Sequence, residues 1–510
     1  MRTGKFANGV IGKAVLLSLL FLASAVTTAA GDPTETKLYA SDPGFGDRFG
    51  VSAAVTGTYG VIGAQANDDL GGDSGSAYVI DLLTGTELYK LLPSDGAGGD
   101  YFGCALAACG DLAVIGALRN DQVADDAGSA YVFDITDSTE LHILHASDGA
   151  EDDWFGKSVG ISESYAIVGA YKADAATYIT NSGKAYIYDL ATGTELHALV
   201  PSDTGKDDWF GHGVAVSESY ALVGAPTWDA PGASACGAAY VFDVATGAQL
   251  WTLTATDRVA GDRTGNAVAI SGDYAVVGSY WNYHVNGSDA GAVYIFDMTD
   301  GTQVRKLVAS DASPGAWFGT SVAVSGNIAI IGATHDGSSK AGKAYIFDIT
   351  TGAELGKMVA SDADTTDENN YGISVGIDGS YGLVGADKDK AASYLAGAAY
   401  LYEPVGISTA VADQPAPPAS FALLNRPNPF NPVTEIRMVL PENAPVSFEV
   451  YDVSGRLLRT LLPAGPRSAG TVRAVWDGTD DGGREVPSGV YFCRAEAGRY
   501  RATRKMTLIR

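Results

Sequence analysis

The sequence predicts an all-β protein in which a seven-bladed β-propeller is followed by a small Ig-like β-sandwich. The first observation is a repeated pair of residues, usually aromatic then glycine, at Phe49-Gly50, Phe102-Gly103, Phe155-Gly156, Phe210-Gly211, Thr264-Gly265, Phe318-Gly319 and Tyr371-Gly372. The steps between these anchors are 53, 53, 55, 54, 54 and 53 residues. A period of this size built from short strands is typical of propellers. The composition agrees, because 64 Gly against 5 Met favours turns and strands over helices.

Residues 1–30 have the pattern of a secretory signal peptide. Basic residues precede an apolar run from Ala14 to Ala23, and small residues follow it. The run is too short for a membrane span, and no other stretch approaches the roughly 20 apolar residues that a spanning helix needs. We therefore expect an exported chain without a transmembrane segment once the signal is removed.

Each repeat unit predicts four antiparallel strands in a meander. In the sixth unit, alternating apolar residues and turn residues place the strands at Thr320–Val324, Ile328–Gly332, Lys343–Asp348 and Glu354–Ala360. The second strand of each unit ends in a glycine that is usually followed by alanine. We expect these glycines where inner strands crowd toward the axis and a side chain would not fit.

The two ends of the array indicate how the ring closes. The seventh unit stops after its third strand, Ala399–Glu403, whereas Lys37–Asp42 matches the fourth strands at Lys90–Asp95 and Lys357–Asp362. The N-terminal strand is therefore predicted to complete the last blade, which removes the exposed sheet edges of an open array. On this basis the propeller spans residues 31–405.

The array resembles the FG-GAP repeat, the blade unit of the integrin α-chain propeller and of many bacterial surface proteins. Phe-Gly and the Gly-Ala strand end recur in register, and Gly224-Ala225-Pro226 gives one full match. Integrin-like blades carry an Asp-x-Asp-x-Asp-Gly calcium loop between these two motifs, but this chain has only a short turn there, such as Ser325-Gly326-Asn327. Three residues cannot supply the six to eight oxygens that calcium prefers. The sequence therefore predicts no metal site and no cofactor.

Charge and loop position favour one face as the ligand face. Residues 31–418 hold 17 Lys and Arg against 51 Asp and Glu, and so acidic a body would repel nucleic acid. In a four-stranded meander, the loops after the second and fourth strands emerge on the same side, and these loops carry the aspartates, as in Asp148–Asp153. The aspartates serve either as turn formers or as weak cation ligands.

Candidate ligand-binding side chains edge the same face. They are the residues before the repeated pair, together with nearby aromatic residues and one histidine: Arg48, Tyr101, Trp154, Trp209, Arg263, Trp317, His212, Trp228 and Trp281. Aromatic residues around a polar cavity can stack on sugar rings or on peptide side chains. The alternative is that they only separate neighbouring blades, and His212 has packing as its alternative.

Catalytic motifs are absent from the sequence: we find no His-Glu-x-x-His, no Gly-x-Ser-x-Gly and no phosphate-binding Gly-Lys-Ser/Thr. The stretch from Asp243 to Trp251 resembles the tryptophan-docking repeat of quinoproteins, but the other units lack its tryptophan. The four cysteines form no disulfide framework or metal motif. Free buried thiols are expected, with a Cys104–Cys109 pair as the alternative.

A Pro/Ala-rich linker at residues 406–420 leads to a C-terminal unit at residues 421–510. Its alternating strands, broken by Pro and Gly, predict a small β-sandwich. Asn428–Pro432, Gly455-Arg456 and Trp476–Gly478 closely resemble the Ig-like C-terminal domain of FlgD-type and type IX secretion sorting modules. That resemblance implies export across an outer membrane through the secretion machinery. Asp477–Asp481 is interpreted as a turn, with a metal loop as the alternative.

These predictions leave three functional hypotheses. The first is a secreted or cell-surface bacterial protein, associated with the outer membrane, that binds a glycan or protein ligand without catalysis. The second is a secreted hydrolase or lyase acting at the propeller channel, which requires an acid and base with shifted pKa values near the axis. The third is a structural surface component without a defined ligand.

Overall fold

The computed structural model describes residues 34–509, except 177–178, 284–286, 337–340, 363–368, 391, 404, 406–422, 427–431, 441–442, 453–455, 468–469 and 498–499. The predicted signal peptide at residues 1–30 and the predicted linker at 406–420 lie outside the described residues. Within the described ranges every regular element is a strand. No described helix is therefore long and apolar enough to cross a membrane.

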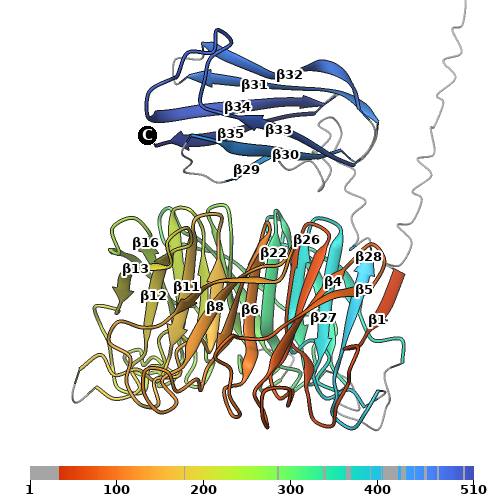
Figure 1. The fold of residues 1–510 in the computed structure, drawn as a ribbon. Helices are drawn as coiled ribbons and strands as arrows, with labels where there is room; N and C mark the ends of the chain where they lie inside the picture. The colour runs from red at the N-terminus through yellow and green to blue at the C-terminus, as the bar shows by residue number, and fades with distance from the viewer. Residues whose placement is uncertain are drawn as a thin grey trace, which may run out of the picture.

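Seven four-stranded antiparallel sheets are arranged as blades (Figure 1). In six of them the strands pair in chain order, and in the seventh the order is β26-β27-β28-β1. The strands of blades 1 to 3 are β2 Phe49–Thr56, β3 Tyr59–Ala64, β4 Ser76–Asp81, β5 Thr86–Leu91, β6 Phe102–Cys109, β7 Leu112–Ala117, β8 Ser129–Asp134, β9 Thr139–Leu144, β10 Ser158–Ile161, β11 Tyr165–Ala170, β12 Lys184–Asp189 and β13 Thr194–Leu199. Those of blades 4 to 7 are β14 Gly213–Val216, β15 Tyr220–Ala225, β16 Ala238–Asp243, β17 Gln249–Leu253, β18 Val268–Ser271, β19 Tyr274–Ser279, β20 Ala292–Asp297, β21 Gln303–Leu307, β22 Phe318–Ser325, β23 Ile328–Ala333, β24 Lys343–Asp348, β25 Glu354–Met358, β26 Val375–Asp378, β27 Tyr381–Ala386, β28 Ala398–Glu403 and the N-terminal β1 Thr34–Leu38.

The N-terminal strand closes the ring, as the sequence predicts. β1 pairs antiparallel with β28, from Thr34 opposite Glu403 to Leu38 opposite Ala399. The strand begins three residues earlier than the predicted Lys37–Asp42 segment and ends at Leu38. Asp42, past the strand end, instead accepts hydrogen bonds from Tyr78 and Lys90 of blade 1 at 2.8 and 2.5 Å.

Glycines bring neighbouring blades into backbone contact, which confirms their predicted role. A Cβ added to Gly332 would lie 2.0 Å from the carbonyl oxygen of Gly372 in the next blade. The corresponding glycines of the other blades meet the same oxygen of the next repeat at 1.8–2.3 Å. The glycine of each repeated pair also has a positive φ, +91° at Gly50 and +92° at Gly319, which disfavours other residues. Close contact between blades requires glycine at the strand end, and the positive φ favours glycine in the repeated pair.

A side chain of the first strand or its entry donates a hydrogen bond to the backbone of the next blade at all seven interfaces. These inner inter-blade bonds run from Ser52 to Gly103, Cys104 to Gly156, Ser158 to Gly211, His212 to Asn266, Asn266 to Gly319, Ser321 to Gly372 and Ser374 to Gly50. Where alanine replaces the serine, as at Ala105 and Ala267, the preceding Cys104 and Asn266 supply the donor. No two of the four cysteines form a disulfide; Cys104, Cys236 and Cys493 are buried as expected, and Cys109 is half-buried.

Outer inter-blade bonds are equally regular. A Glu or Gln of each fourth strand accepts the backbone N–H of the Ser or Thr that follows the fourth strand of the preceding blade: Glu87–Ser41, Glu140–Ser94, Glu195–Ser147, Gln249–Ser202, Gln303–Thr256, Glu354–Ser310 and Glu35–Ser361. At six interfaces a third-strand tyrosine also donates to the aspartate beside that residue, as Tyr186 does to Asp148 at 2.7 Å. The pair Glu35–Ser361 extends the series across the closure.

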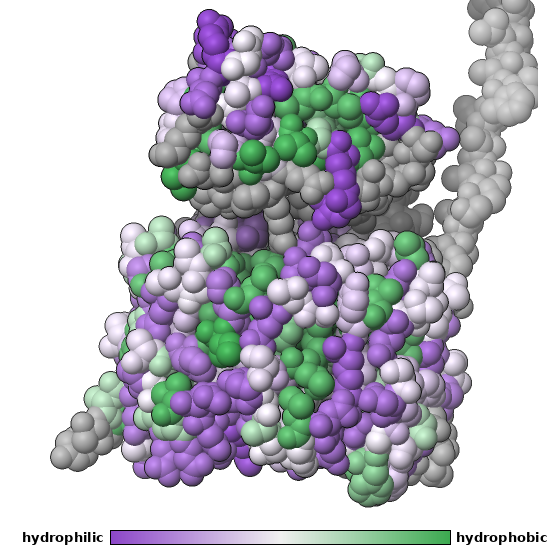
Figure 2. All heavy atoms as spheres, in the orientation of Figure 1, coloured by the Kyte–Doolittle hydropathy of each residue, from purple (hydrophilic) through white to green (hydrophobic). Residues whose placement is uncertain are grey.

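The fourth strands form the outer edge of the ring. Most of them expose an apolar side chain, such as Leu88, Leu141 and Leu355, at 41–44%. Figure 2 shows green hydrophobic patches among hydrophilic residues on this side of the propeller. The strands are only five or six residues long, which limits pairing with other chains.

The C-terminal unit is a small β domain of two sheets. Its strands are β29 Leu423–Arg426, β30 Thr434–Leu440, β31 Ala444–Asp452, β32 Leu457–Arg467, β33 Gly470–Trp476, β34 Gly489–Ala497 and β35 Tyr500–Leu508, ordered β29-β30-β33 and β32-β31-β34-β35. Trp476 is fully buried and packs edge-on against Tyr491. Asp477 and Asp480 accept backbone N–H groups two residues ahead, which confirms the turn interpretation.

This domain lies over the face that carries the tight hairpin turns of the blades (Figure 1). Arg437 of β30 lies 3.5 Å from Asp111 in the β6–β7 turn, and Arg504 of β35 pairs with Glu163 in the β10–β11 turn. The opposite face, with the long loops after the second and fourth strands, is not the one contacted by these ion pairs.

Candidate functional site

The loop face is edged by residues in a strained backbone conformation. The seven residues before the repeated pair all have φ between +55° and +60°: Arg48, Tyr101, Trp154, Trp209, Arg263, Trp317 and Asn370. This left-handed conformation costs a non-glycine residue roughly 1–2 kcal/mol. In six of the seven turns the carbonyl of this residue accepts the N–H three residues ahead, as Trp154 does from Lys157. The turn thus places a large side chain at the entry of each innermost strand.

In blades 2 to 4 these side chains form a continuous series of contacts. The Arg119 guanidinium lies 5.3 Å from the Tyr101 ring and 5.2 Å from the Trp154 ring. Tyr171 then packs edge-on between Trp154 and Trp209, with both centroid distances 5.7 Å. Edge-to-face pairs of this kind stabilise by about 0.5–1.5 kcal/mol beyond their burial. Residues from three blades therefore build one surface.

The series continues through blades 5 and 6. Arg263 bridges the rings of Trp209 and Trp281, at 5.5 and 3.9 Å. Tyr280 follows, 5.9 Å from Trp317, and the His335 ring lies 3.7 Å from Trp317. We call the half-buried set the rim cluster: Tyr101, Arg119, Trp154, Tyr171, Lys172, Trp209, Arg263, Tyr280, Trp281, Trp317 and His335.

The closing blades interrupt this cluster with a polar group. Arg48 of blade 1 lies 3.8 Å from the carboxylate of Asp387 in blade 7, and Asn370 donates a hydrogen bond of 3.0 Å to the same carboxyl group. Burial raises the pKa of Asp387 despite the opposing effects of Asn370 and Arg48. The rim is consequently asymmetric, aromatic and cationic over five blades and polar over two.

Six of the nine candidate residues belong to the rim cluster, and Arg48 lies at the closure. The other two, Trp228 and His212, make contacts outside the cluster. Trp228 packs against the hydrophobic core of blade 4. His212 makes the inner inter-blade bond of blade 4, where Nδ1 donates to the Asn266 carbonyl at 3.1 Å, and its ring also contacts Tyr171. Burial, with the nearby Lys157 charge, lowers the pKa of His212 to about 4, so the imidazole is neutral at pH 7. Both residues have a packing role in the blades.

Five buried aspartates close the loops just before the repeated pair. The residues are Asp47, Asp100, Asp153, Asp208 and Asp262, and each carboxylate accepts the backbone N–H three residues earlier, at 2.6–2.9 Å. Burial raises the pKa of each of them, more than these hydrogen bonds lower it. Because the same contact recurs in five blades, their shifted pKa values follow from the fold.

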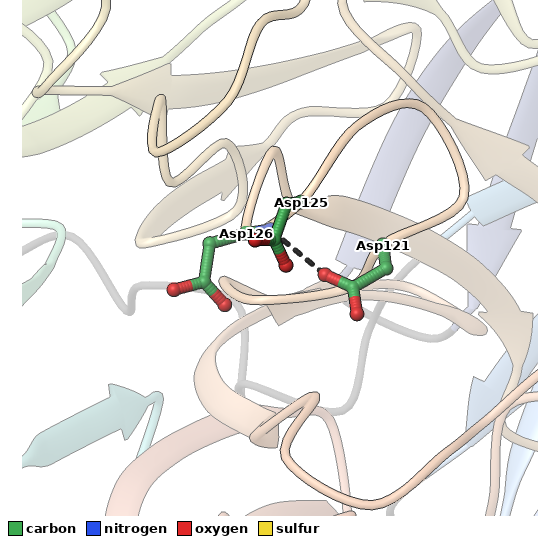
Figure 3. Close-up of side chains that lie close together, drawn as sticks. All are labelled: Asp121, Asp125 and Asp126. Atoms are coloured by element: carbon green, nitrogen blue, oxygen red, sulfur yellow. Dashed lines mark hydrogen bonds between the residues drawn. The ribbon is translucent and has the colours of Figure 1, made fainter.

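Acidic side chains gather further out on the loop face. A pocket of about 290 Å³ beside blade 3 is lined by acidic and basic residues, among them Asp148, Asp153, Lys172 and Asp174. Asp121, Asp125 and Asp126 lie close enough together to offer three oxygens to one ion (Figure 3). The backbone N–H of Asp126 donates to Asp121 at 2.8 Å, so this group also shapes its own loop.

The calcium loops of integrin-like blades do not fit this chain. The turns between first and second strands contain two or three residues in every blade, as at residues 57–58 and 217–219. Each such turn offers at most one carboxylate, far fewer than the six to eight oxygen ligands of calcium. The acidic group at Asp121 lies in a different loop, after the second strand.

Sequence reasoning did not single out Arg119, Lys172 and His335 as rim residues. They stand two residues after the Gly-Ala motif, where Trp281 also stands after Gly278-Ser279. That constant offset from the motif was the available signal. The contacts themselves could not be predicted from the sequence, because each of these side chains reaches a residue of the neighbouring repeat or loop.

Comparison with known families agrees with the repeat and the C-terminal domain. The FG-GAP repeat model matches seven times, at residues 34–80, 86–133, 139–188, 194–242, 248–296, 302–347 and 353–402. Each match begins on a fourth strand, one strand out of phase with the blades, which is why β1 must complete blade 7. The FlgD Ig-like domain model matches residues 432–500. No curated protein matches the chain. The chain belongs to the FG-GAP repeat family and carries a FlgD Ig-like domain.

Proposed function

We propose that this protein is a non-catalytic recognition or adhesion module that binds a glycan or protein ligand on the loop face of its propeller. The observation that carries the proposal is the asymmetry of the rim. Inter-blade bonds repeat at all seven interfaces, whereas the rim cluster occupies five blades and gives way to Arg48, Asn370 and Asp387 at the closure. A purely structural ring would have no need of this difference.

The hydrolase or lyase alternative has weaker support in the geometry. It calls for an acid and a base with shifted pKa values that face each other near the axis. The buried aspartates with raised pKa values instead bind their own loops, and His212 is neutral and bonded to the next blade. Recognition by preformed aromatic and charged side chains is the function that these contacts favour.

We further propose that the protein reaches the bacterial surface or medium through its two ends. The apolar run at residues 14–23 supports export across the inner membrane, and the C-terminal domain at residues 421–510 supports passage across the outer membrane by the secretion machinery. Deleting residues 421–510 is expected to leave the protein in the periplasm. Surface display of that truncated chain, measured by protease accessibility on whole cells, would contradict this part.

The ligand-binding proposal is tested by a glycan and matrix-protein array probed with the exported chain. Binding is expected to be lost in Trp209→Asn, which removes the indole while asparagine tolerates the positive φ of 58°. Trp251→Phe is the matched control, because Trp251 is 38% exposed on the outer edge, away from the rim. Equal loss of binding in both variants, or no binding by the parent chain, would refute the loop-face site.

A further inference from the structure

The cations of the rim differ in their partners from those of the outer edge. Lys90, Lys184 and Lys306 each pair with the aspartate of an outer inter-blade contact at 2.5–2.7 Å. Among the residues that the structure describes, Arg263 and Lys172 have no carboxylate within ion-pair distance. They lie instead over indole rings, 3.9 Å from Trp281 and 3.2 Å from Trp154. In a chain of net charge −27, these two cations are thus left without an ion-pair partner, whereas the third, Arg119, lies 3.8 Å from the carboxylate of Asp126 through its Nε.

The rim also holds buried hydrogen-bond donors without an acceptor. Within the described ranges, Nε1 of Trp154 and Trp281 and Nε of Arg119 and Arg263 are buried and have no hydrogen-bond partner. A buried donor left unsatisfied costs about 1–3 kcal/mol. All four donors belong to neighbouring members of one cluster, which extends from blade 2 to blade 5. The side chains that carry these atoms are themselves half-buried, so their exposed parts remain open to a ligand that supplies acceptors.

The donor set indicates the chemistry of that ligand. Indole, guanidinium and ammonium groups donate hydrogen bonds and accept none. A peptide brings a backbone N–H for nearly every carbonyl, so it would add donors to a surface already rich in them. A sugar acid brings carboxylate oxygens that only accept, together with an apolar C–H face that packs on aromatic rings.

We propose that the rim cluster binds acidic glycans, with uronate carboxylates near Arg119 and Arg263 and sugar faces against the adjoining aromatic rings. This inference rests on the recognition function proposed above and specifies its ligand class. At physiological ionic strength charges further apart than about 8 Å are largely screened, so the more distant acidic loops oppose this binding only weakly. Asp126 is closer, 3.8 Å from Arg119, and a uronate carboxylate at Arg119 displaces it. The acidic loops reduce binding of broad polyanions such as nucleic acid.

The test compares an oligogalacturonate with the same chain after its carboxylates are reduced to hydroxymethyl groups. Calorimetric titration of the exported chain is expected to show at least about tenfold tighter binding of the acid form, since hydrogen bonds to charged groups contribute more than neutral ones. The difference should shrink as salt is raised. Arg263→Gln and, as a second variant, Arg119→Gln should each lose about tenfold in affinity for the acid form while binding of the reduced form changes little.

Arg305→Gln is the control, because Arg305 lies on the outer edge and donates to the Thr350 carbonyl. Melting temperatures of all variants identify any loss of affinity that follows from unfolding. Equal affinity for the acid and reduced forms would overturn this inference and leave the recognition function standing. Tighter binding of poly-glutamate than of the uronate would also overturn it, in favour of an acidic peptide. Binding of neither glycan would overturn it while protein ligands on the array still test the recognition function.

Discussion

The outer edge of the propeller keeps the same contacts in every blade, whereas the residues of the loop-face rim change from blade to blade. At the outer edge, every interface has the same bond from a Ser or Thr N–H to a Glu or Gln, including Glu35–Ser361 at the closure. At the rim, the residue at one and the same position is Arg, Tyr, Trp, Trp, Arg, Trp or Asn in turn, although its backbone φ hardly varies. The repeat therefore preserves the contacts that hold the blades together and varies the side chains that meet solvent at the rim.

Removing β1 is the change expected to break the outer edge most severely. A chain that begins at residue 43 loses the fourth strand of blade 7, the burial of Leu38 and the bonds of Glu35 and Lys37. Burying a leucine contributes about 1.5–3 kcal/mol and each buried polar group left unpaired costs about 1–3 kcal/mol, so the loss should be roughly 5 kcal/mol or more. Thermal unfolding measures it against a chain that begins at residue 31. An unchanged melting temperature would mean that the ring does not depend on this closure.

Glycine substitutions within blade 6 separate inter-blade contacts from the outer edge strand. In Gly332→Ala the new Cβ would lie 2.0 Å from the Gly372 oxygen, so the backbone of two blades must shift, at a cost of about 3 kcal/mol. In Gly356→Ala the Cβ would lie 3.7 Å from Ile346 Cδ1, an ordinary contact, and stability should change by less than about 0.5 kcal/mol. Denaturant unfolding of the two variants measures the difference. Similar stabilities would contradict the close approach of the blades.

Acid should weaken the outer edge at Asp148. Burial alone would raise the pKa of Asp148, but the hydrogen bonds from Lys184 and Tyr186 outweigh it and hold the pKa below its usual range. The stabilising contribution is therefore fully present above the unfolded pKa near 3.9 and is lost as pH falls through the lower folded value. Because this carboxylate is half exposed, the contribution is at most about 1 kcal/mol.

The measurement is the difference in melting temperature between the parent chain and Asp148→Asn as a function of pH. The parent should be the more stable at pH 7, and the difference should shrink as pH falls below the unfolded pKa near 3.9 and vanish once pH lies below the folded pKa. The control is Trp154→Asn, which removes no ionisable group. A constant difference for Asp148→Asn across this range would show that the outer bond does not depend on the carboxylate charge.

The propeller was predictable because its signals are local and repeated. Spacing of the aromatic-glycine pair predicts the number of blades, and the match of Lys37–Asp42 to other fourth strands predicts the closure, with an offset of three residues in the strand start. Strand boundaries in blade 6 agree closely, with Lys343–Asp348 reproduced in full. The turn at Asp477–Asp481 was predicted from the resemblance to FlgD-type domains.

The rim was only partly predictable, because its contacts join side chains from different repeats. Sequence position places Trp154, Trp209 and Arg263 on one face, but gives no reason for Arg263 to lie between Trp209 and Trp281. His212 is the opposite case, because a residue predicted to bind a ligand makes a contact between blades. It was selected for its position after Phe210-Gly211, whereas the structure uses it to supply the inter-blade hydrogen bond that serine makes in four other blades. Compensation of this kind is visible only once neighbouring strands are paired.

The central claim is that the outer edge builds the ring while the rim binds the ligand, and blade 3 allows both halves to be measured together. Trp154→Asn changes the rim, and Glu195→Ala removes the acceptor of Ser147 at the outer edge. Binding to the array ligands and the melting temperature are measured for both variants. Trp154→Asn should lose binding, and its melting temperature should fall by no more than the loss of its edge-to-face contact, about 0.5–1.5 kcal/mol. Glu195→Ala should keep binding and melt lower by the equivalent of about 1 kcal/mol. The reverse result, a rim variant that melts lower and still binds, would contradict the account.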